Sequence, residues 1–330
     1  MQFQFRNFIL NSLRRIAMPI GVYAGLEITG ATVKEAVTDS KKQAEAVLAM
    51  HERFGTRILL TAMDLSAEAE LFGSQVSMPE DEIPTVIGRK ATSEREIDQL
   101  ALPKAGDGRT AVHLETAGRL ASQSDGCPVL GGAIGPLSLA GRLFGVSDVL
   151  ELSLTNPELL EKLLGKTTQF LIEYMRAFRD QGADGVIMAE PVAGLLSPKG
   201  LNRLSSTYIR QIVEKTQSEK FSIVYHNCGA KFVHLSKILE AGADVFHFGA
   251  PMDLGKAIEQ VGGPVILSGN LDPSGVFKNG TPQEVAAQTT TLMKLGAGHI
   301  NFIPSSGCDL PPHTPLENLD AFFQTVSAYS

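Results

Sequence analysis

The chain contains 330 residues, of which 43% are hydrophobic, and it includes 32 glycines and 17 prolines. This composition is typical of a soluble, turn-rich globular enzyme and excludes a fibre, a disordered tail and a disulfide scaffold. The 29 basic and 36 acidic residues give a net charge of −7, without a long block of one sign. Because phosphate binding requires a concentrated basic face, we expect no nucleic-acid partner.

The first 21 residues lack the uninterrupted apolar core and the small-residue cleavage site of a secretory signal. No segment reaches the roughly 18 to 20 apolar residues that cross a bilayer, so we expect a cytoplasmic protein without a membrane partner. Three cysteines, Cys127, Cys228 and Cys308, lie far apart in the sequence. An odd and sparse set favours reduced thiols, which can bind a metal.

Eight short apolar runs have the length of buried parallel strands. In chain order they are "MPIGVYAG" near Ile20, "RILLTAM" near Leu59, "CPVLGGAI" near Leu130, "GVIMAEP" after Asp184, "FSIVYHN" near Val224, "VFHFGAP" after Asp244, "GPVILSGN" near Ile266 and "HINFIPS" after Gly298. Gly182, Gly242 and Gly296 precede three of these runs, and each suits the left-handed residue that ends a helix.

Amphipathic helices are predicted between the strands. Residues 156–181 begin with Asn156 as the cap and Pro157 in the first turn, and residues 281–295 repeat this arrangement with Thr281 and Pro282. The alternation predicts a single-domain (β/α)8 barrel over residues 1–330, although an open doubly wound sheet would show a similar alternation.

One polar stretch, at about residues 73–126, fits this alternation badly. We interpret it as an excursion between the second and third strands that ends in a helix.

The loops after the carboxyl ends of the strands build the active site of such a barrel. Extended residues two apart project to the same side, so His226 and Cys228 can bind one ion together with Cys308 from the last strand. One nitrogen and two sulfur ligands favour zinc and leave a position for a substrate. The polar side chains expected at this rim are Tyr23, Asp64, Glu68, Glu70, Glu190, His226, Cys228, His247, Asn270, Asp272, Cys308 and Asp309.

A structural role remains open as an alternative for each of the three candidate metal ligands. Cys228 and Cys308 could be small buried hydrophobes, and His226 could be a core histidine whose hydrogen bonds are satisfied. Cys127 lies at the amino end of its strand, away from the rim, and is predicted to be structural.

Five motifs, in order, carry a resemblance over nearly the whole chain. They are "MDLSAEAELFG", "GGAIGPLSLAGRLFG", "FLIEYMRAFRDQGADGVIMAEPVAGLLSP", "GNLDPSGVFKNGTPQEV" and "GHINFIPSSGCDLPPHTPLENLDAFFQTV". Together they resemble the uroporphyrinogen decarboxylase superfamily, which implies a (β/α)8 barrel.

Two chemistries occur in that superfamily. The decarboxylases carry an arginine-containing segment after the first strand, which meets the carboxylates of the porphyrinogen. The corresponding stretch here, "GVYAGLEITG", has no arginine, so decarboxylation of a polyanionic tetrapyrrole is disfavoured. The chain is similar instead to the methylcobamide:coenzyme M methyltransferases, which implies that His226, Cys228 and Cys308 are zinc ligands.

The resemblance also points to Asp64 and Glu190 as candidate catalytic groups. Either carboxylate could be a displaceable fourth zinc ligand or a proton acceptor, and a solvent-facing or structural role is equally open for each.

The implied reaction moves a methyl group from a methylated corrinoid, carried by a partner protein, to a thiol such as coenzyme M. A thiol that enters the open position on zinc loses its proton and becomes the nucleophile. Three alternatives remain: methyl transfer to tetrahydrofolate, a decarboxylase acting on another carboxylated substrate, and a non-catalytic corrinoid- or tetrapyrrole-binding protein.

Overall fold

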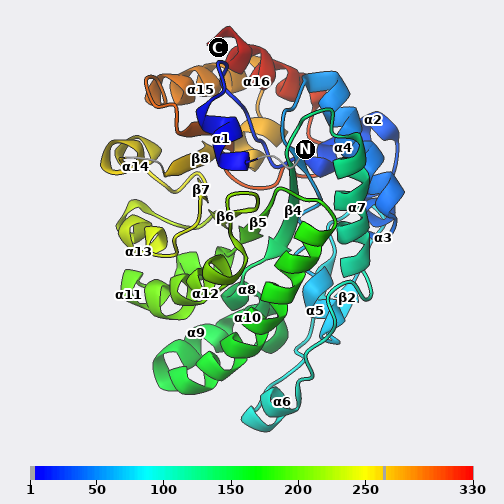
Figure 1. Cartoon of the computed structure of the whole chain (residues 1–330), viewed down its shortest axis with the longest axis vertical. Coiled ribbons are helices and arrows are strands. Elements are labelled where there is room, and N and C mark those ends of the chain that lie inside the picture. Colours follow the sequence, from blue (N-terminus) through cyan, green and yellow to red (C-terminus); the bar gives the residue numbers. More distant parts are fainter. Residues whose placement is uncertain (1–3, 263–264, 330) are drawn as a thin grey trace.

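The computed structural model describes residues 4–262 and 265–329. Its main feature is a curled sheet of seven parallel strands in the order β1-β4-β5-β6-β7-β8-β9, surrounded by helices (Figure 1). This architecture confirms the predicted (β/α)8 barrel class, and each of these seven strands overlaps a predicted apolar run, with β8 and β9 ending one residue beyond it. The strands are β1 (Leu59–Leu60), β4 (Val129–Ile134), β5 (Gly185–Ala189), β6 (Ser222–Asn227), β7 (Val245–Phe248), β8 (Ile266–Leu271) and β9 (Phe302–Ser306).

The first predicted strand, near Ile20, does not form a regular strand. Residues 16–20 run beside β9, where the Met18 amide donates to the Pro304 carbonyl (3.0 Å) and the Ile20 amide donates to the Ser306 hydroxyl (3.0 Å). Pro19 lies between them and has no N–H, so a regular ladder cannot form. Tyr23, expected in a loop, lies in the helix α2 that begins directly afterwards.

Helices and short helical turns connect the strands. Within the described residues, none of these helices is long and apolar enough to cross a membrane. The α-helices are α1 (Phe5–Leu10), α2 (Val22–Thr29), α3 (Val33–Thr38), α4 (Ser40–Phe54), α5 (Ala67–Leu71), α6 (Glu94–Gln99), α7 (Thr110–Gln123), α8 (Pro136–Phe144), α9 (Val146–Thr155), α10 (Pro157–Asp180), α11 (Pro198–Leu201), α12 (Thr207–Thr216), α13 (Leu235–Leu239), α14 (Leu254–Gln260), α15 (Pro282–Leu295) and α16 (Leu316–Ala328). The short turns are η1 (Pro191–Leu195), η2 (Asn202–Ser206), η3 (Phe232–His234) and η4 (Pro273–Lys278).

Between β1 and β4 the chain forms α5, an antiparallel hairpin, α6 and α7. The hairpin consists of β2 (Gln75–Ser77) and β3 (Thr85–Ile87), with Val76 opposite Val86. Figure 1 shows the part that carries α6 reaching away from the barrel.

The predicted helix caps are confirmed. Asn156 accepts a hydrogen bond from the Leu159 amide (3.2 Å) at the start of α10, and Thr281 forms a capping box with Glu284 at the start of α15. Gly182 and Gly242 have the expected positive φ, at +92° and +74°.

The third glycine prediction is wrong, because Gly296 has φ −82°. A Cβ at this position would lie 2.1 Å from the Phe302 ring, so glycine is required here for close packing of α15 against β9. Gly298, at φ +80°, takes the left-handed turn instead.

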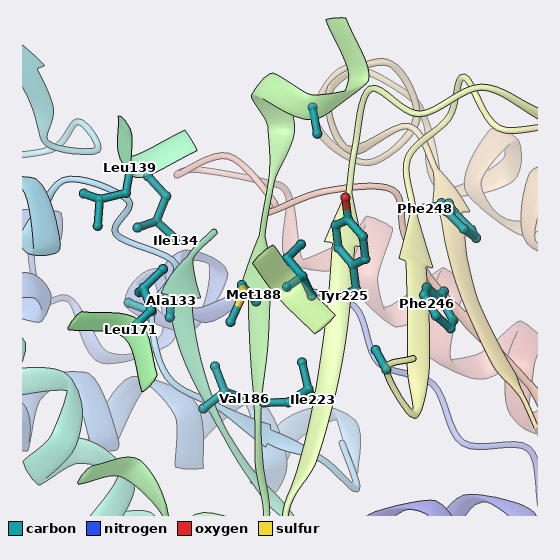
Figure 2. Packing of buried hydrophobic residues seen from close by; sticks show 14 of the residues in the cluster. Ala133, Ile134, Leu139, Leu171, Val186, Met188, Ile223, Tyr225, Phe246 and Phe248 are labelled. Atoms are coloured by element: carbon teal, nitrogen blue, oxygen red, sulfur yellow. The ribbon is translucent and has the colours of Figure 1, made fainter. Parts of the chain in front are cut away.

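Alternation along the strands separates two apolar layers. On the outer face, Val186, Met188, Ile223, Tyr225 and Phe246 pack in rows between the sheet and the helices (Figure 2). A second cluster fills the barrel interior and includes Phe5 and Ile9 of α1. Its strand residues are Leu60, Leu130, Ile187, Ala189, Val224, Val245, Ile266 and Ile303.

Above this interior apolar layer, toward the carboxyl ends of the strands, lies a polar one. His226, His247, Ser268 and Ser305 each follow an interior aliphatic residue by two positions, and each is at most 1% exposed. The barrel therefore places polar side chains at its mouth, on an apolar floor.

The contact between α2 and α4 provides a test of the packing. A Cβ at Gly25 would lie 2.2 Å from the Ala46 carbonyl oxygen, so we expect Gly25→Ala to lower the free energy of unfolding by about 1–3 kcal/mol. The matched change is Gly165→Ala in α10, where the added Cβ would meet no atom within 4 Å apart from the nearby backbone of its own helix, and it should raise stability by about 0.5–1 kcal/mol. Urea denaturation of both variants checks this, and equal shifts in the midpoint would contradict the packing described.

Candidate functional site

The mouth of the barrel brings together three potential metal ligands that are distant in sequence. His226 is the penultimate residue of β6, Cys228 follows that strand directly, and Cys308 lies just after β9. Their ligand atoms lie within 4.8 Å of one another. Over residues 4–262 and 265–329, no other group of three or more His, Cys, Asp or Glu side chains is placed to hold a metal ion.

Glycines allow both cysteine loops to pack closely against the loop that follows β7. A Cβ at Gly249, just after β7, would lie 2.1 Å from the Cys228 carbonyl oxygen, and a Cβ at Gly307 would lie 2.9 Å from the Ala250 amide. Asn270 fixes the same region, because its side-chain amide donates to the carbonyls of Gly249 (3.1 Å) and Met252 (2.8 Å). The backbone at the ends of β7, β8 and β9 thus holds both thiols in place.

The two thiols interact directly. A hydrogen bond between them lowers the pKa of Cys228 to about 7, while the same bond, with burial, raises the pKa of Cys308 to about 12. The pair therefore loses one proton near neutral pH and shares the other. Both cysteines are partly exposed, whereas His226 is 1% exposed. The cysteine side of the group is therefore less buried than the histidine side.

This donor set fits a zinc ion. Two sulfur ligands at about 2.3 Å from a tetrahedral ion lie roughly 3.8 Å apart, so the observed separations require only a small contraction. One imidazole and two thiolates also leave one position of a tetrahedral ion open. The chemistry of such a site is the binding and activation of a thiol or water.

Glu190 lies close to this group in the sheet but points elsewhere. Its backbone amide donates to the His226 carbonyl (2.8 Å), yet its carboxylate accepts from the amides of Leu137 (2.8 Å) and Ser138 (3.1 Å) at the start of α8. The Ser205 hydroxyl donates to it as well, at 3.2 Å. Burial raises the pKa of Glu190 to about 7. These contacts place the carboxylate outside the barrel interior, where it caps α8.

Asp64 lies at the opposite part of the mouth, after β1. One of its oxygens accepts from the amide (3.0 Å) and the hydroxyl (2.6 Å) of Ser66, and the other pairs with Arg109. Arg109 also pairs with Glu70 at 2.5 Å. The structure thus brings neither Asp64 nor Glu190 into the metal-ligand group among the described residues. Arg109 was missed in the sequence, because it lies in the excursion and no motif marks it.

Two further buried groups face this part of the mouth. Glu68 accepts from the Ile134 amide at 2.9 Å, and burial raises its pKa to about 7. Its other oxygen and the Tyr23 hydroxyl are buried without a hydrogen-bond partner among the described residues. Cys127, expected to be structural, is buried near the amino end of β4 and does not join the ligand group.

Comparison with known proteins identifies the family. Residues 6–329 match the family described as uroporphyrinogen decarboxylase (URO-D). The methylcobamide:CoM methyltransferase MtbA of Methanosarcina acetivorans is 28% identical over 92% of this chain and 89% of its own length. The methylated-thiol–coenzyme M methyltransferase of Methanosarcina mazei is 26% identical over 90% of this chain and 79% of its own.

Two other comparisons add detail. The uroporphyrinogen decarboxylase of Dechloromonas aromatica is 30% identical, but only over 62% of this chain and 59% of its own. A solved structure, a methyltransferase from Methanosarcina mazei, superposes with a TM-score of 0.89 at 23% identity, covering 99% of this chain and 98% of that one, which confirms the fold. The chain therefore belongs to the uroporphyrinogen decarboxylase family and is a methyltransferase-like enzyme within it.

Proposed function

We propose that this protein is a zinc-dependent methyltransferase that moves a methyl group from a methylated corrinoid to a thiol such as coenzyme M. The observation that carries the proposal is the convergence of His226, Cys228 and Cys308 within 4.8 Å at the barrel mouth. The relatives that align along nearly the whole chain support it, because their names describe methyl transfer to coenzyme M. The decarboxylase relatives align over a shorter part.

Each residue of the group has a distinct role in this proposal. His226, Cys228 and Cys308 would hold the ion, which on binding a thiol in its open position supplies a thiolate at neutral pH. The two sulfurs face the accessible side, so the thiol enters from the mouth. The interior layer of Val224, Val245, Ile266 and Ile303 closes the site from below and keeps water out of the barrel.

The methylated corrinoid would be presented by a partner protein at the same mouth. Leu195 in η1 and Val233 in η3 are each 64% exposed, and both turns follow the carboxyl ends of strands next to the candidate site. These two apolar side chains are the part of the rim where we expect the partner protein to dock.

Catalytic roles for Glu190 and Asp64 stay predictions. The Glu190 carboxylate accepts hydrogen bonds from α8 and η2, and the Asp64 carboxylate is bonded to Ser66 and Arg109. These contacts favour a positioning role for both carboxylates over proton transfer to or from a substrate.

Zinc content and the cysteines give the first test. The purified protein should contain about one zinc per chain, and Cys308→Ala should lose nearly all of it together with methyl transfer. Cys127→Ala is the matched control, since Cys127 is also a free cysteine but lies outside the ligand group, and it should retain both properties. Retention of zinc and activity by Cys308→Ala would overturn the site assignment.

The acceptor is tested with free methylcobalamin as the donor. We expect methyl transfer to coenzyme M, and no transfer to tetrahydrofolate, because the proposed site activates a thiol. Mass spectrometry of the methylated product distinguishes the two acceptors. Transfer only to tetrahydrofolate would exclude the thiol acceptor.

Two buried carboxyl groups with similar pKa values allow a test of Glu190. The Glu190 carboxylate accepts hydrogen bonds from two backbone N–H groups, so Glu190→Gln places the new side-chain NH2 group against one of these donors. We therefore expect the free energy of unfolding to fall by about 1–3 kcal/mol. The shape of the pH profile of kcat/KM should not change. Glu68→Gln is the matched control for Glu190→Gln, since burial raises the pKa of both Glu68 and Glu190 to about 7.

If Glu190 accepted a proton instead, it would act only when ionised, so kcat/KM would rise with pH through about 7. Glu190→Gln alone would then remove this rise and lower kcat/KM roughly 100-fold.

A further inference from the structure

We propose that His247 and Ser305 fix the tautomer of His226, so that its Nδ1 carries the proton and its Nε2 presents a lone pair to the sulfurs of Cys228 and Cys308. The inference rests on the proposed metal site and names the positioning residues behind it. It assigns a role to two buried polar residues that the proposed reaction does not otherwise use.

The three side chains form a short chain of hydrogen bonds across the barrel interior. His226 and His247 are register partners in β6 and β7, and their Nδ1 atoms lie 2.8 Å apart. The Nε2 atom of His247 lies 2.8 Å from the Ser305 hydroxyl oxygen. Ser305 lies in turn 2.5 Å from the Met18 carbonyl oxygen. All three side chains are at most 1% exposed, so solvent does not compete for these bonds.

The direction of every bond follows from the last acceptor. A carbonyl oxygen can only accept, so the single proton of the Ser305 hydroxyl is committed to Met18. Ser305 therefore accepts from His247, and Nε2 of His247 carries a proton. The assignment needs no assumption about a metal ion.

His247 carries one ring proton only. Within the described residues no acidic side chain forms a hydrogen bond or an ion pair with His247, and a second ring proton would leave an uncompensated charge in this buried layer, so the ring is neutral. With its proton on Nε2, its Nδ1 is an acceptor, and the atom opposite must donate. His226 Nδ1 is consequently a protonated nitrogen, and in the neutral imidazole that binds a metal the lone pair then lies on Nε2.

This tautomer is the one that a metal site needs. A neutral imidazole binds a metal through its unprotonated nitrogen, and the second nitrogen usually donates to a fixed acceptor that sets the orientation of the ring. Free histidine in water favours a proton on Nε2, which would block the ring nitrogen that is not paired with His247. His247 and Ser305 therefore act as positioning residues, because they select the binding-competent form before any ion arrives.

The chain of bonds also connects the candidate site to the closure of the barrel. Met18 belongs to the extended segment beside β9, and its amide donates to the Pro304 carbonyl at 3.0 Å. The Met18 carbonyl, which determines the direction of all these hydrogen bonds, thus belongs to the segment that takes the place of the eighth strand of the barrel.

Ser268 provides a matched control for Ser305. Both serines are 0% exposed and lie on neighbouring strands, and Ser268 is the register partner of His247. None of the described residues forms a hydrogen bond with the Ser268 hydroxyl. Ser305→Ala and Ser268→Ala remove the same atom from the same layer, but only the first removes the acceptor of His247.

The test is long-range ¹H–¹⁵N NMR of the full-length protein with ¹⁵N-labelled histidines, with zinc and without it. We expect His226 to show a protonated Nδ1 in both states and Nε2 as the metal-bound nitrogen with zinc. Ser305→Ala should give a mixture of tautomers without metal and a zinc affinity roughly 10–100-fold weaker by chelator competition. Ser268→Ala should leave the spectrum and the affinity unchanged.

Substitutions of His247 complete the design. His247→Asn places an amide oxygen near the position of Nδ1 and should keep the zinc affinity closer to that of the wild type, whereas His247→Leu leaves the His226 proton unpaired and should weaken binding roughly 10–100-fold.

A proton on Nε2 of His226 in the metal-free protein, metal binding through Nδ1, or equal losses in Ser305→Ala and Ser268→Ala would overturn the proposal. These readouts do not involve methyl transfer. The expected tautomer and zinc affinity in a protein that transfers no methyl group would therefore refute the proposed function alone.

Discussion

The closure of the barrel by residues 16–20 is the constraint on which the candidate site depends. This segment is not a regular strand, because Pro19 interrupts the ladder, yet Met18 and Ile20 bond to β9 through one backbone carbonyl and one serine hydroxyl. On its other side β9 is joined to β6 through β8 and β7, and the curl of this sheet brings the carboxyl ends of β6 and β9 to the same mouth. That arrangement brings Cys308 to His226 and Cys228, although 80 residues separate the two cysteines in the sequence.

A buried layer of polar side chains destabilises the fold unless these side chains form hydrogen bonds. Moving an imidazole or a hydroxyl from water into the protein interior costs free energy if the group forms no hydrogen bond there. Most buried polar groups in proteins are therefore hydrogen-bonded. His226, His247 and Ser305 satisfy one another and end at the Met18 carbonyl. The same bonds that make burial tolerable also orient the nitrogen that would bind the metal, so the stability of this layer and the proposed function share one set of contacts.

Much of this arrangement is predictable from the sequence. Apolar runs predict the seven strands, and capping residues predict the starts of α10 and α15. The alternation of side chains and the ends of the strands predict that one rim carries His226, Cys228 and Cys308. The failures have local causes: a proline replaces a ladder donor at residue 19, and Gly296 accommodates the Phe302 ring rather than a left-handed turn. The outward direction of Glu190 is a consequence of strand alternation, and counting forward from the interior residues Ile187 and Ala189 would have indicated it.

Other features could not be read from the chain. The pairing of Asp64 with Arg109 joins β1 to the excursion, and no spacing links the two residues. The serine that accepts from His247 has no motif of its own, although Ile303 and Ser305 repeat the two-residue alternation of Val224 and His226. Long-range contacts between side chains depend on how the strands shift relative to one another, and only the folded structure fixes that register.

X-ray absorption at the zinc edge tests the central claim most directly, because it reports the atoms around the metal. For the zinc-loaded protein we predict two sulfur neighbours at about 2.3 Å and at least one nitrogen at about 2.0 Å, with a third sulfur after addition of coenzyme M. A shell of nitrogen and oxygen alone, or an unchanged shell when the thiol is added, would contradict the proposed site and its function.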